Sequence, residues 1–249
     1  MRSVRFSYPA RSHATPAPRS VAVHGAAGGY LYPMPAPVPV HEAPFSPEAS
    51  LEGKDEAFRA ALARATTAFD DGGLPYLMMG GIASTILGRR RPTHDIDVFV
   101  RPTDALQALA ILAGAGFETE ETFPDWLFKA YRDGQLVDVI FRSSGDIYLD
   151  EDMLARSRVE PYLGHPVRVI PPEDLAVIKA VVHAEHMPRH WHDAVAILGT
   201  ADIDWEYLVR RARRGVRRVL ALLLYAQSCD LPVPAWAVER LHALLRDGR

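Results

Sequence analysis

Residues 74–100 read LPYLMMGGIASTILGRRRPTHDIDVFV, and this stretch predicts a strand, a helix and a second strand in close succession. An apolar run ends at Gly80-Gly81, which opens the helix. The strand after the helix carries Asp95 and Asp97 at alternate positions between apolar residues, which places both carboxylates on one face. Strands that alternate with helices over so short a distance indicate an α/β arrangement.

Asp95 and Asp97 are the most unusual feature of this stretch, because aspartate is depleted in strands. Their Cα atoms are expected about 6.6 Å apart, and two carboxylates at that spacing repel each other unless a cation lies between them. Carboxylate oxygens suit Mg²⁺ or Mn²⁺, so one interpretation is a divalent metal site. The other interpretation is a strand end at which both side chains are solvated.

The glycine pair before the helix is typical of an anion site. Gly80-Gly81 allows a ligand to approach the backbone, and the N-terminus of a helix presents free N–H groups to a phosphate. Ser84, one turn into the helix, is a candidate for a further hydroxyl contact. An ordinary turn is the alternative for the glycines alone, but their position beside two aspartates favours a phosphate cradle next to a metal site.

Asp138 is a third acid in an unexpected place, inside an apolar β-rich run. The dipeptide Asp133-Gly134 separates this run from the preceding one and predicts a two-residue hairpin turn. Counting outward from the turn places Lys129 directly opposite Asp138. The acid therefore either forms a cross-strand ion pair, worth about 0.2–1 kcal/mol, or belongs to the metal site.

The composition describes an ordinary globular protein and excludes a disulfide-rich or Cys-rich metal protein. The chain has 249 residues, of which 48% are hydrophobic, a single cysteine, and no apolar run of membrane-spanning length. Nine of the 20 prolines lie in residues 1–50, which predicts a disordered Pro-rich tail. We expect an α/β domain over 51–171 and a helical domain over 172–249.

The predicted fold class is α/β (α+β), with a small mixed sheet flanked by helices and a helical C-terminal half. Thr103 is expected to cap the third helix. The predicted helices of the first domain cover about 52–71, 82–87 and 103–113, and the predicted strands cover 74–79, 95–100, 126–132 and 135–141.

These residues together resemble the signature of the nucleotidyltransferase superfamily that includes DNA polymerase beta. The matching positions are residues 80–84, residues 91–97 and Asp138. Two later segments, 172–179 and 189–194, are similar to the AbiEii-type toxin nucleotidyltransferases and their uncharacterised relatives. The resemblance covers about residues 55–200 and implies a nucleotidyltransferase-type sheet.

The resemblance also implies a role for each charged residue. Asp95 and Asp97 would hold two Mg²⁺ ions that grip a nucleoside triphosphate, with Mn²⁺ as the alternative ion. Asp138 would be the third ligand and would help to deprotonate the attacking hydroxyl. Lys179 would contact the triphosphate, and Asp193 would orient this lysine.

The nucleotide-binding set follows from the same resemblance. The superfamily often has Gly-Ser where this chain has Gly80-Gly81, so Ser84 would have to supply the hydroxyl. The expected nucleotide-binding residues are Gly80, Gly81, Ser84, Arg91, Thr93 and Lys179.

A dense run of arginines between residues 210 and 218 suggests contact with a polyanion. RNA binding is one interpretation, and a solvated helix face is the other. Together with the arginines at 89–91, which are also candidates for holding a triphosphate, the run favours tRNA or another RNA as acceptor. The six candidate RNA-binding residues are Arg210, Arg211, Arg213, Arg214, Arg217 and Arg218.

Four histidines crowd into residues 183–192, which invites comparison with a zinc site. Pro188 interrupts the helix between the second and third of them, and no cysteine is near. A partly exposed helical hairpin is therefore the favoured interpretation. The four are His183, His186, His190 and His192.

We expect an enzyme that transfers a nucleoside monophosphate from an NTP such as ATP to a hydroxyl, releasing pyrophosphate. The acceptor would be tRNA or other RNA, a protein or a small molecule. A cytoplasmic toxin paired with an antitoxin protein is one form of this activity, and an antibiotic-modifying enzyme is another. A catalytically silent nucleotide- or RNA-binding regulator is the alternative from a different class, and no membrane partner is expected.

Overall fold

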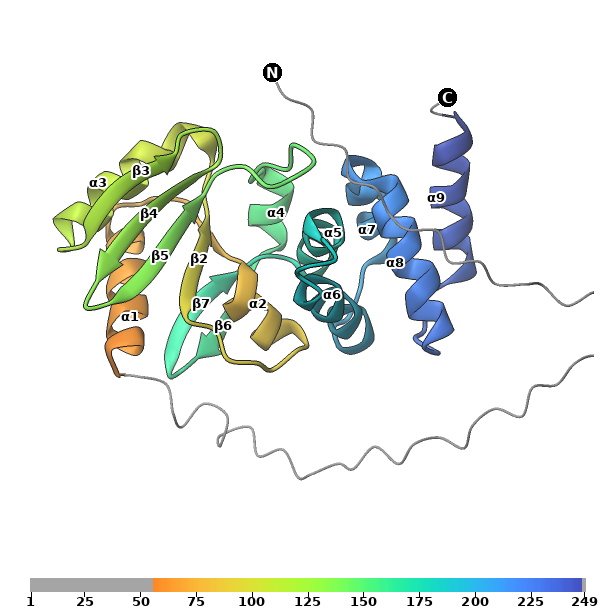
Figure 1. Ribbon diagram of the computed structural model, residues 1–249, viewed down its shortest axis with the longest axis horizontal. Coiled ribbons are helices and arrows are strands. Elements are labelled where there is room, and N and C mark those ends of the chain that lie inside the picture. Colours follow the sequence, from red (N-terminus) through yellow and green to blue (C-terminus); the bar gives the residue numbers. More distant parts are fainter. Residues whose placement is uncertain (1–55, 248–249) are drawn as a thin grey trace, which may run out of the picture. The chain divides into compact units, whose positions relative to one another are not determined.

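The computed structural model describes residues 56–247, and the tail predicted over residues 1–50 lies outside them. Within the described residues seven strands form one mixed sheet, in the order β3-β4-β5-β2-β1-β7-β6 (Figure 1). The strands are β1 (Leu77–Met78), β2 (Asp95–Phe99), β3 (Glu118–Phe123), β4 (Leu127–Arg132), β5 (Gln135–Ile140), β6 (Arg158–Tyr162) and β7 (His165–Val169).

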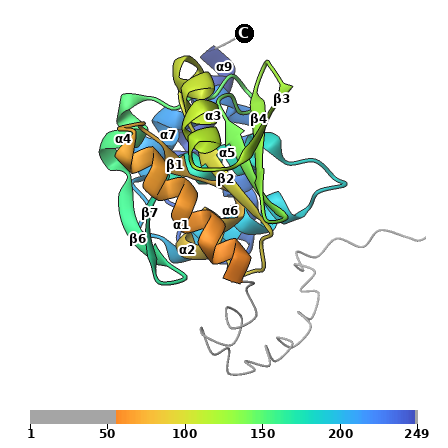
Figure 2. The same ribbon diagram turned by 90° about the vertical axis from the view of Figure 1, so that its left-hand side faces the viewer.

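Helices pack on this sheet and then continue without further strands to the end of the described chain. Figure 2 shows α1 and α3 in front of the sheet, where they contact β5. The helices are α1 (Glu56–Asp71), α2 (Gly80–Leu87), α3 (Ala105–Gly114), α4 (Glu151–Arg156), α5 (Pro172–Val182), α6 (Arg189–Thr200), α7 (Trp205–Arg211), α8 (Val216–Ser228) and α9 (Ala235–Asp247), with short 3₁₀ turns η1 (Pro102–Asp104) and η2 (Ala212–Arg214).

The central strands β2 and β5 run parallel and bury one set of alternate side chains. Ile96 and Val98 of β2, and Val137 and Val139 of β5, are completely shielded from solvent. Since successive side chains of a strand point to opposite faces, the residues between them lie on the other face of the sheet. That face carries the three aspartates singled out in the sequence.

The β4–β5 hairpin confirms the turn predicted from its sequence. Asp133 and Gly134 both have positive φ, 50° and 74°, as a type I′ turn requires. The register pairs Lys129 with Asp138, as counting outward from the turn predicted.

Three strands of the sheet were not predicted, for identifiable reasons. β3 has the sequence ETEETF and is almost entirely exposed, so it lacks the apolar alternation that marks a half-buried strand. The β6–β7 hairpin contains Pro161 and Pro166, which face each other and cannot donate ladder hydrogen bonds. The two prolines therefore removed the sequence signal of a strand, and this hairpin was not predicted.

Two predicted boundaries also differ. The strand expected over 74–79 has only two residues, because Pro75 lacks an N–H and pairing starts at Leu77. Thr103, expected to cap a helix, lies inside η1, and its hydroxyl donates to the side chain of Asp104, from which α3 continues.

The mixed sheet flanked by helices, with a helical C-terminal part from α5 onward, confirms the predicted fold class. None of the helices in residues 56–247 has the length and apolarity needed to cross a bilayer. The division at residue 171 stays a prediction.

Candidate active site

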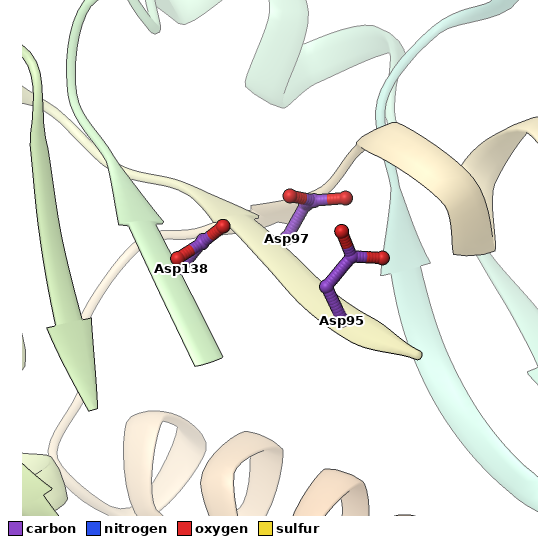
Figure 3. A group of neighbouring side chains, drawn as sticks. All are labelled: Asp95, Asp97 and Asp138. Atoms are coloured by element: carbon purple, nitrogen blue, oxygen red, sulfur yellow. The ribbon is translucent and has the colours of Figure 1, made fainter. Parts of the chain in front are cut away.

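The three aspartates converge because their strands are neighbours. The parallel register of β2 and β5 places Asp97 beside Asp138, and Asp95 lies two residues earlier on the same face. One carboxylate oxygen from each lies within 4.8 Å of the others (Figure 3). Among the described residues this is the one group of three or more acids, histidines or cysteines close enough to share a metal ion.

The electrostatics of this cluster suit a divalent cation. Burial, together with the charges of Asp95 and Asp138, raises the pKa of Asp97 from 3.8 to about 7. Burial also raises the pKa of Asp138, although Lys129 opposes the shift. Three oxygen ligands that repel one another in a half-buried site fit the oxygen-only coordination that Mg²⁺ or Mn²⁺ prefers.

This shift predicts that Asp97→Asn stabilises the metal-free protein at alkaline pH. Because the folded-state pKa is raised, the folded chain holds this proton more tightly than the unfolded chain, and stability falls as pH rises from about 4 to about 7. At pH 8 we expect an unfolding temperature at least about 2–4 °C higher, the equivalent of about 1 kcal/mol. The gain should vanish near pH 4. Thermal unfolding in the presence of a chelator measures the gain at pH 8 and its loss near pH 4. The exposed Asp202→Asn is the control. An equal gain at the two pH values would contradict the raised pKa of Asp97.

Asp138 also forms the cross-strand ion pair that the sequence offered as an alternative. Lys129 Nζ lies 2.8 Å from Asp138 Oδ1, and both side chains are largely buried. The two interpretations thus hold together, since the same carboxylate belongs to the three-acid cluster. The ion pair fixes the orientation of Asp138 and lowers the repulsion within the cluster.

The glycine pair allows the start of α2 to approach the aspartates closely. Gly80 has φ +57°, and a Cβ there would lie 1.7 Å from Asp97 Oδ2. A Cβ on Gly81 would lie 2.1 Å from Thr93 Oγ1, and the Gly81 N–H donates to Asp97 Oδ2 at 3.3 Å. Gly80 therefore makes room for the Asp97 carboxylate and Gly81 for the Thr93 side chain, two requirements that the sequence did not reveal.

Gly80→Ala is accordingly expected to disrupt the cluster. The left-handed conformation costs a non-glycine residue about 1–2 kcal/mol, and Asp97 must move to admit the methyl group. We expect a lower free energy of unfolding in urea and weakened Mn²⁺ binding. Gly114→Ala is the matched control, because nothing lies within 4 Å of its added Cβ. Retention of both properties in Gly80→Ala would contradict the close approach.

The hydroxyls of Ser84 and Thr93, which were expected to bind nucleotide, both form hydrogen bonds within the protein. Ser84 is completely buried, and its Oγ donates to the Gly80 carbonyl at 2.7 Å, so it is not among the residues that line the cavity described below. Thr93 is also buried, and its hydroxyl donates to Asp95 Oδ1 at 2.5 Å. Thr93 therefore orients a carboxylate of the cluster.

Lys179 and Asp193 meet as the resemblance implied, within a larger ionic network. Lys179 Nζ lies 2.9 Å from Asp193 Oδ2, and both side chains are almost fully buried. Arg89 and Arg91 contact the same carboxylate at 2.9 and 3.0 Å. Burial alone would raise the pKa of Asp193, but Arg91, Lys179 and Arg89 outweigh it and hold the pKa below its usual range. Three cations around one carboxylate leave this region electropositive.

A cavity of about 720 Å³ connects the acids with the cationic network. Part of its wall was not anticipated and comes from the β3–β4 turn, the segment after β5 and the start of α6; it includes Phe123, Trp126, Arg142, Ser143, Arg189 and His190. The expected site residues in the wall are Gly80, Gly81, Arg91, Asp95, Asp97, Asp138 and Lys179.

The histidines do not assemble into a zinc site within residues 56–247, because none belongs to a group close enough to share a metal. His183 packs its ring against Trp191 at 5.1 Å between centroids. His190 lies at the cavity, and burial, together with the charges of Lys179 and Arg189, lowers its pKa to about 4. It is therefore a neutral side chain at physiological pH.

The arginine run divides into internal and exposed members. Arg211 donates to Asp174 and Asp150, each at 2.5 Å, and so holds α7 against α5 and α4. Arg218 donates to the His183 carbonyl at 3.0 Å but stays exposed. The other exposed members are Arg210, Arg213, Arg214 and Arg217. A role in RNA binding stays a prediction for this exposed set.

A mixed sheet that brings paired strand aspartates to a cavity beside a helix N-terminus is the arrangement that the resemblance to nucleotidyltransferases, a class of enzymes, implied. The chain belongs to the family described as uncharacterised nucleotidyltransferases, whose sequence profile matches residues 37–229. This confirms the resemblance inferred from the sequence.

Solved structures with a similar arrangement share little sequence with the chain. The antibiotic-resistance factor ANT(2″)-Ia in complex with adenylyl-2″-tobramycin is 22% identical over 64% of this chain and 97% of its own, with TM-score 0.46. The lincomycin-bound lincosamide adenylyltransferase LnuA is 14% identical over 57% and 98%, with TM-score 0.42. The toxin MenT4 from Mycobacterium tuberculosis H37Rv is 14% identical over 77% and 75%, with TM-score 0.35. The search of curated proteins gave no match.

Proposed function

We propose that the chain transfers a nucleoside monophosphate from an NTP to a hydroxyl acceptor in a reaction that depends on Mg²⁺ or Mn²⁺. The observation that carries the proposal is the convergence of Asp95, Asp97 and Asp138, whose carboxylate oxygens lie within 4.8 Å of one another at the cavity. Membership of the nucleotidyltransferase family supports the reaction class.

The three carboxylates are the residues that would hold the metal. Divalent ions supply charge neutralisation for the triphosphate and for the oxygens that enter and leave the α-phosphorus. Two ions are expected from the superfamily resemblance. Thr93 and the Gly81 N–H keep Asp95 and Asp97 in place through their hydrogen bonds.

The cationic side of the cavity would receive the triphosphate. Lys179 and Arg91 reach the cavity while Asp193 holds both of them. The N-terminus of α2 lies in the same cavity wall, and its dipole favours an anion there, while the Gly81 N–H itself is held by Asp97 Oδ2. Phosphate charge therefore has partners on two sides.

Asp138 is the proposed base for the acceptor hydroxyl. The acceptor oxygen forms a bond to the α-phosphorus, the bond from that phosphorus to the bridging oxygen breaks, and pyrophosphate leaves. The proton of the hydroxyl passes to Asp138, and burial, which raises the pKa of this carboxyl, makes it a better base than an exposed aspartate. Lys129 positions this carboxylate at 2.8 Å.

The test is transfer of label from each α-³²P-NTP, with Mg²⁺, to total RNA, to protein or to small molecules. We expect label to reach one of these acceptors with Mg²⁺ and none to do so in a chelator. If no acceptor is labelled while NTP still binds, the chain is the catalytically silent nucleotide-binding regulator.

A toxin role and a partner antitoxin are narrower proposals that rest on the resemblance to AbiEii-type toxins. Expression of the chain in a bacterial host, compared with an Asp95→Asn variant, tests this role directly. Growth arrest that requires Asp95 supports a toxin, and normal growth during active transfer excludes one. Location in the cytoplasm is proposed on the same basis.

A further inference from the structure

Two large aromatic side chains stand exposed in the cavity wall. Phe123 ends β3, and Trp126 precedes β4, with a turn hydrogen bond from the Trp126 N–H to the Phe123 carbonyl at 3.0 Å. Their rings stack with centroids 5.5 Å apart and planes 19° from parallel, while 46% and 42% of their surfaces stay exposed. Both residues line the cavity that contains the acids. A stacked, solvated aromatic pair presents a flat apolar face to whatever enters.

The strand order separates this pair from the phosphate side. Lys179, Arg91 and the start of α2 lie toward β1 and β2, whereas the β3–β4 turn lies beyond β5, on the other side of Asp138. Lys129 pairs with Asp138, and Trp126 lies three residues before Lys129 along β4. That spacing is about 10 Å along the strand. The aromatic pair therefore lies on the opposite side of Asp138 from the start of α2.

The rim next to this pair carries charges of both signs, because Asp125 and the exposed glutamates of β3 adjoin the two aromatic residues. Arg142 lines the cavity with 44% of its side chain exposed and contacts Asp146. Residues 143–145, which follow Arg142 and also line the cavity, pack against the arginine run. A Cβ on Gly145 would lie only 2.9 Å from the backbone carbonyl of Arg214. The exposed arginines of η2 and α8 therefore adjoin the rim, and their charge complements a polyanion.

We propose that Phe123 and Trp126 form a stacking platform for the terminal base of a single-stranded nucleic acid, whose end hydroxyl is the acceptor. The proposal rests on the proposed function and assigns its acceptor. Every base offers a π-face to an aromatic ring, and the exposed arginines of η2 and α8 supply the cations that such platforms use to follow the phosphates. A protein acceptor would not engage the aromatic pair and the arginines in this way, because a side-chain hydroxyl has no base to stack and no phosphate beside it.

The test measures acceptor binding without NTP, so that it does not depend on catalysis. The probe is a fluorescein-labelled single-stranded RNA about ten nucleotides long, followed by anisotropy, and the same RNA with an abasic 3′ nucleotide. We expect the chain to bind the intact probe about tenfold more tightly than the abasic one, the effect of one base–aromatic stack. Phe123→Ala/Trp126→Ala should lose this preference, and Trp126→Phe should keep most of it.

Tyr131→Ala is the matched control, because Tyr131 is similarly exposed on β4 but lies outside the cavity wall. A parallel titration with ATP and Mg²⁺ should give equal affinities for the chain and the double variant. Weakened ATP binding in the double variant would assign the pair to the incoming base and overturn the proposal. So would equal affinity for intact and abasic RNA, or label transfer to protein or small molecules alone. Absent ATP binding with intact RNA binding would instead count against the proposed function.

Discussion

Asp95→Asn/Asp97→Asn is expected to abolish nucleotidyl transfer, with a rate at least about a thousandfold lower. Asparagine keeps the size of each side chain but removes the negative charge that would hold the cations beside the triphosphate. Metals contribute several kcal/mol to phosphoryl chemistry, which sets the size of the loss. The measurement is single-turnover transfer of label with saturating Mg²⁺.

The double variant should stay folded. Burial of the Asp97 charge and its repulsion by Asp95 and Asp138 raise the pKa of Asp97 to about 7, and the double variant removes this buried charge, so its unfolding temperature should not fall. Asp202→Asn, an exposed aspartate of the helical part, is the control and should transfer at the normal rate. Transfer by the folded double variant within a few-fold of normal would remove the aspartates from the reaction.

Asp193→Ala is expected to have the largest effect on stability. It leaves Lys179, Arg91 and Arg89 together without their shared carboxylate, and Lys179 is almost fully buried. Removal of one partner from a buried ionic network costs about 3–5 kcal/mol, and the partial exposure of Arg89 places the expected loss near the lower value. Urea unfolding measures it.

Lys179→Met separates this structural role from the proposed chemical one. Asp193 keeps both arginines in this variant, so the free energy of unfolding should change by less than in Asp193→Ala. Transfer should nevertheless fall about a hundredfold or more, because a preorganised charge at the triphosphate is lost. The exposed neighbour Arg90→Ala is the control. Normal transfer by Lys179→Met would show that the lysine serves only to neutralise Asp193.

The strand that carries Asp95 and Asp97 could be predicted from the sequence because its pattern is local. Alternation placed Asp95 and Asp97 on one face, and the two-residue turn placed Lys129 opposite Asp138. The two aspartates of β2 meet the Lys129–Asp138 pair through the parallel register of β2 and β5. These strands lie about forty residues apart and are linked by α3 and two strands, β3 and β4. Only the family resemblance linked them in advance.

The rest of the site depends on contacts between distant segments. Arg89 and Arg91 precede Asp193 by more than one hundred residues, and nothing near either position signals the contact. Gly80 was assigned to ligand approach, whereas the structure shows that it admits the side chain of Asp97. The sequence analysis did not single out Phe123 or Trp126 as site residues, and only the fold shows them exposed in the cavity.

The most direct test of the three-acid site is diffraction from crystals grown with Mn²⁺ and a non-hydrolysable NTP analogue, recorded at the manganese absorption edge. We predict anomalous density bounded by the carboxylates of Asp95, Asp97 and Asp138, with the triphosphate directed toward Lys179. Manganese bound elsewhere, or a nucleotide seated with its phosphates away from these carboxylates, would contradict the account.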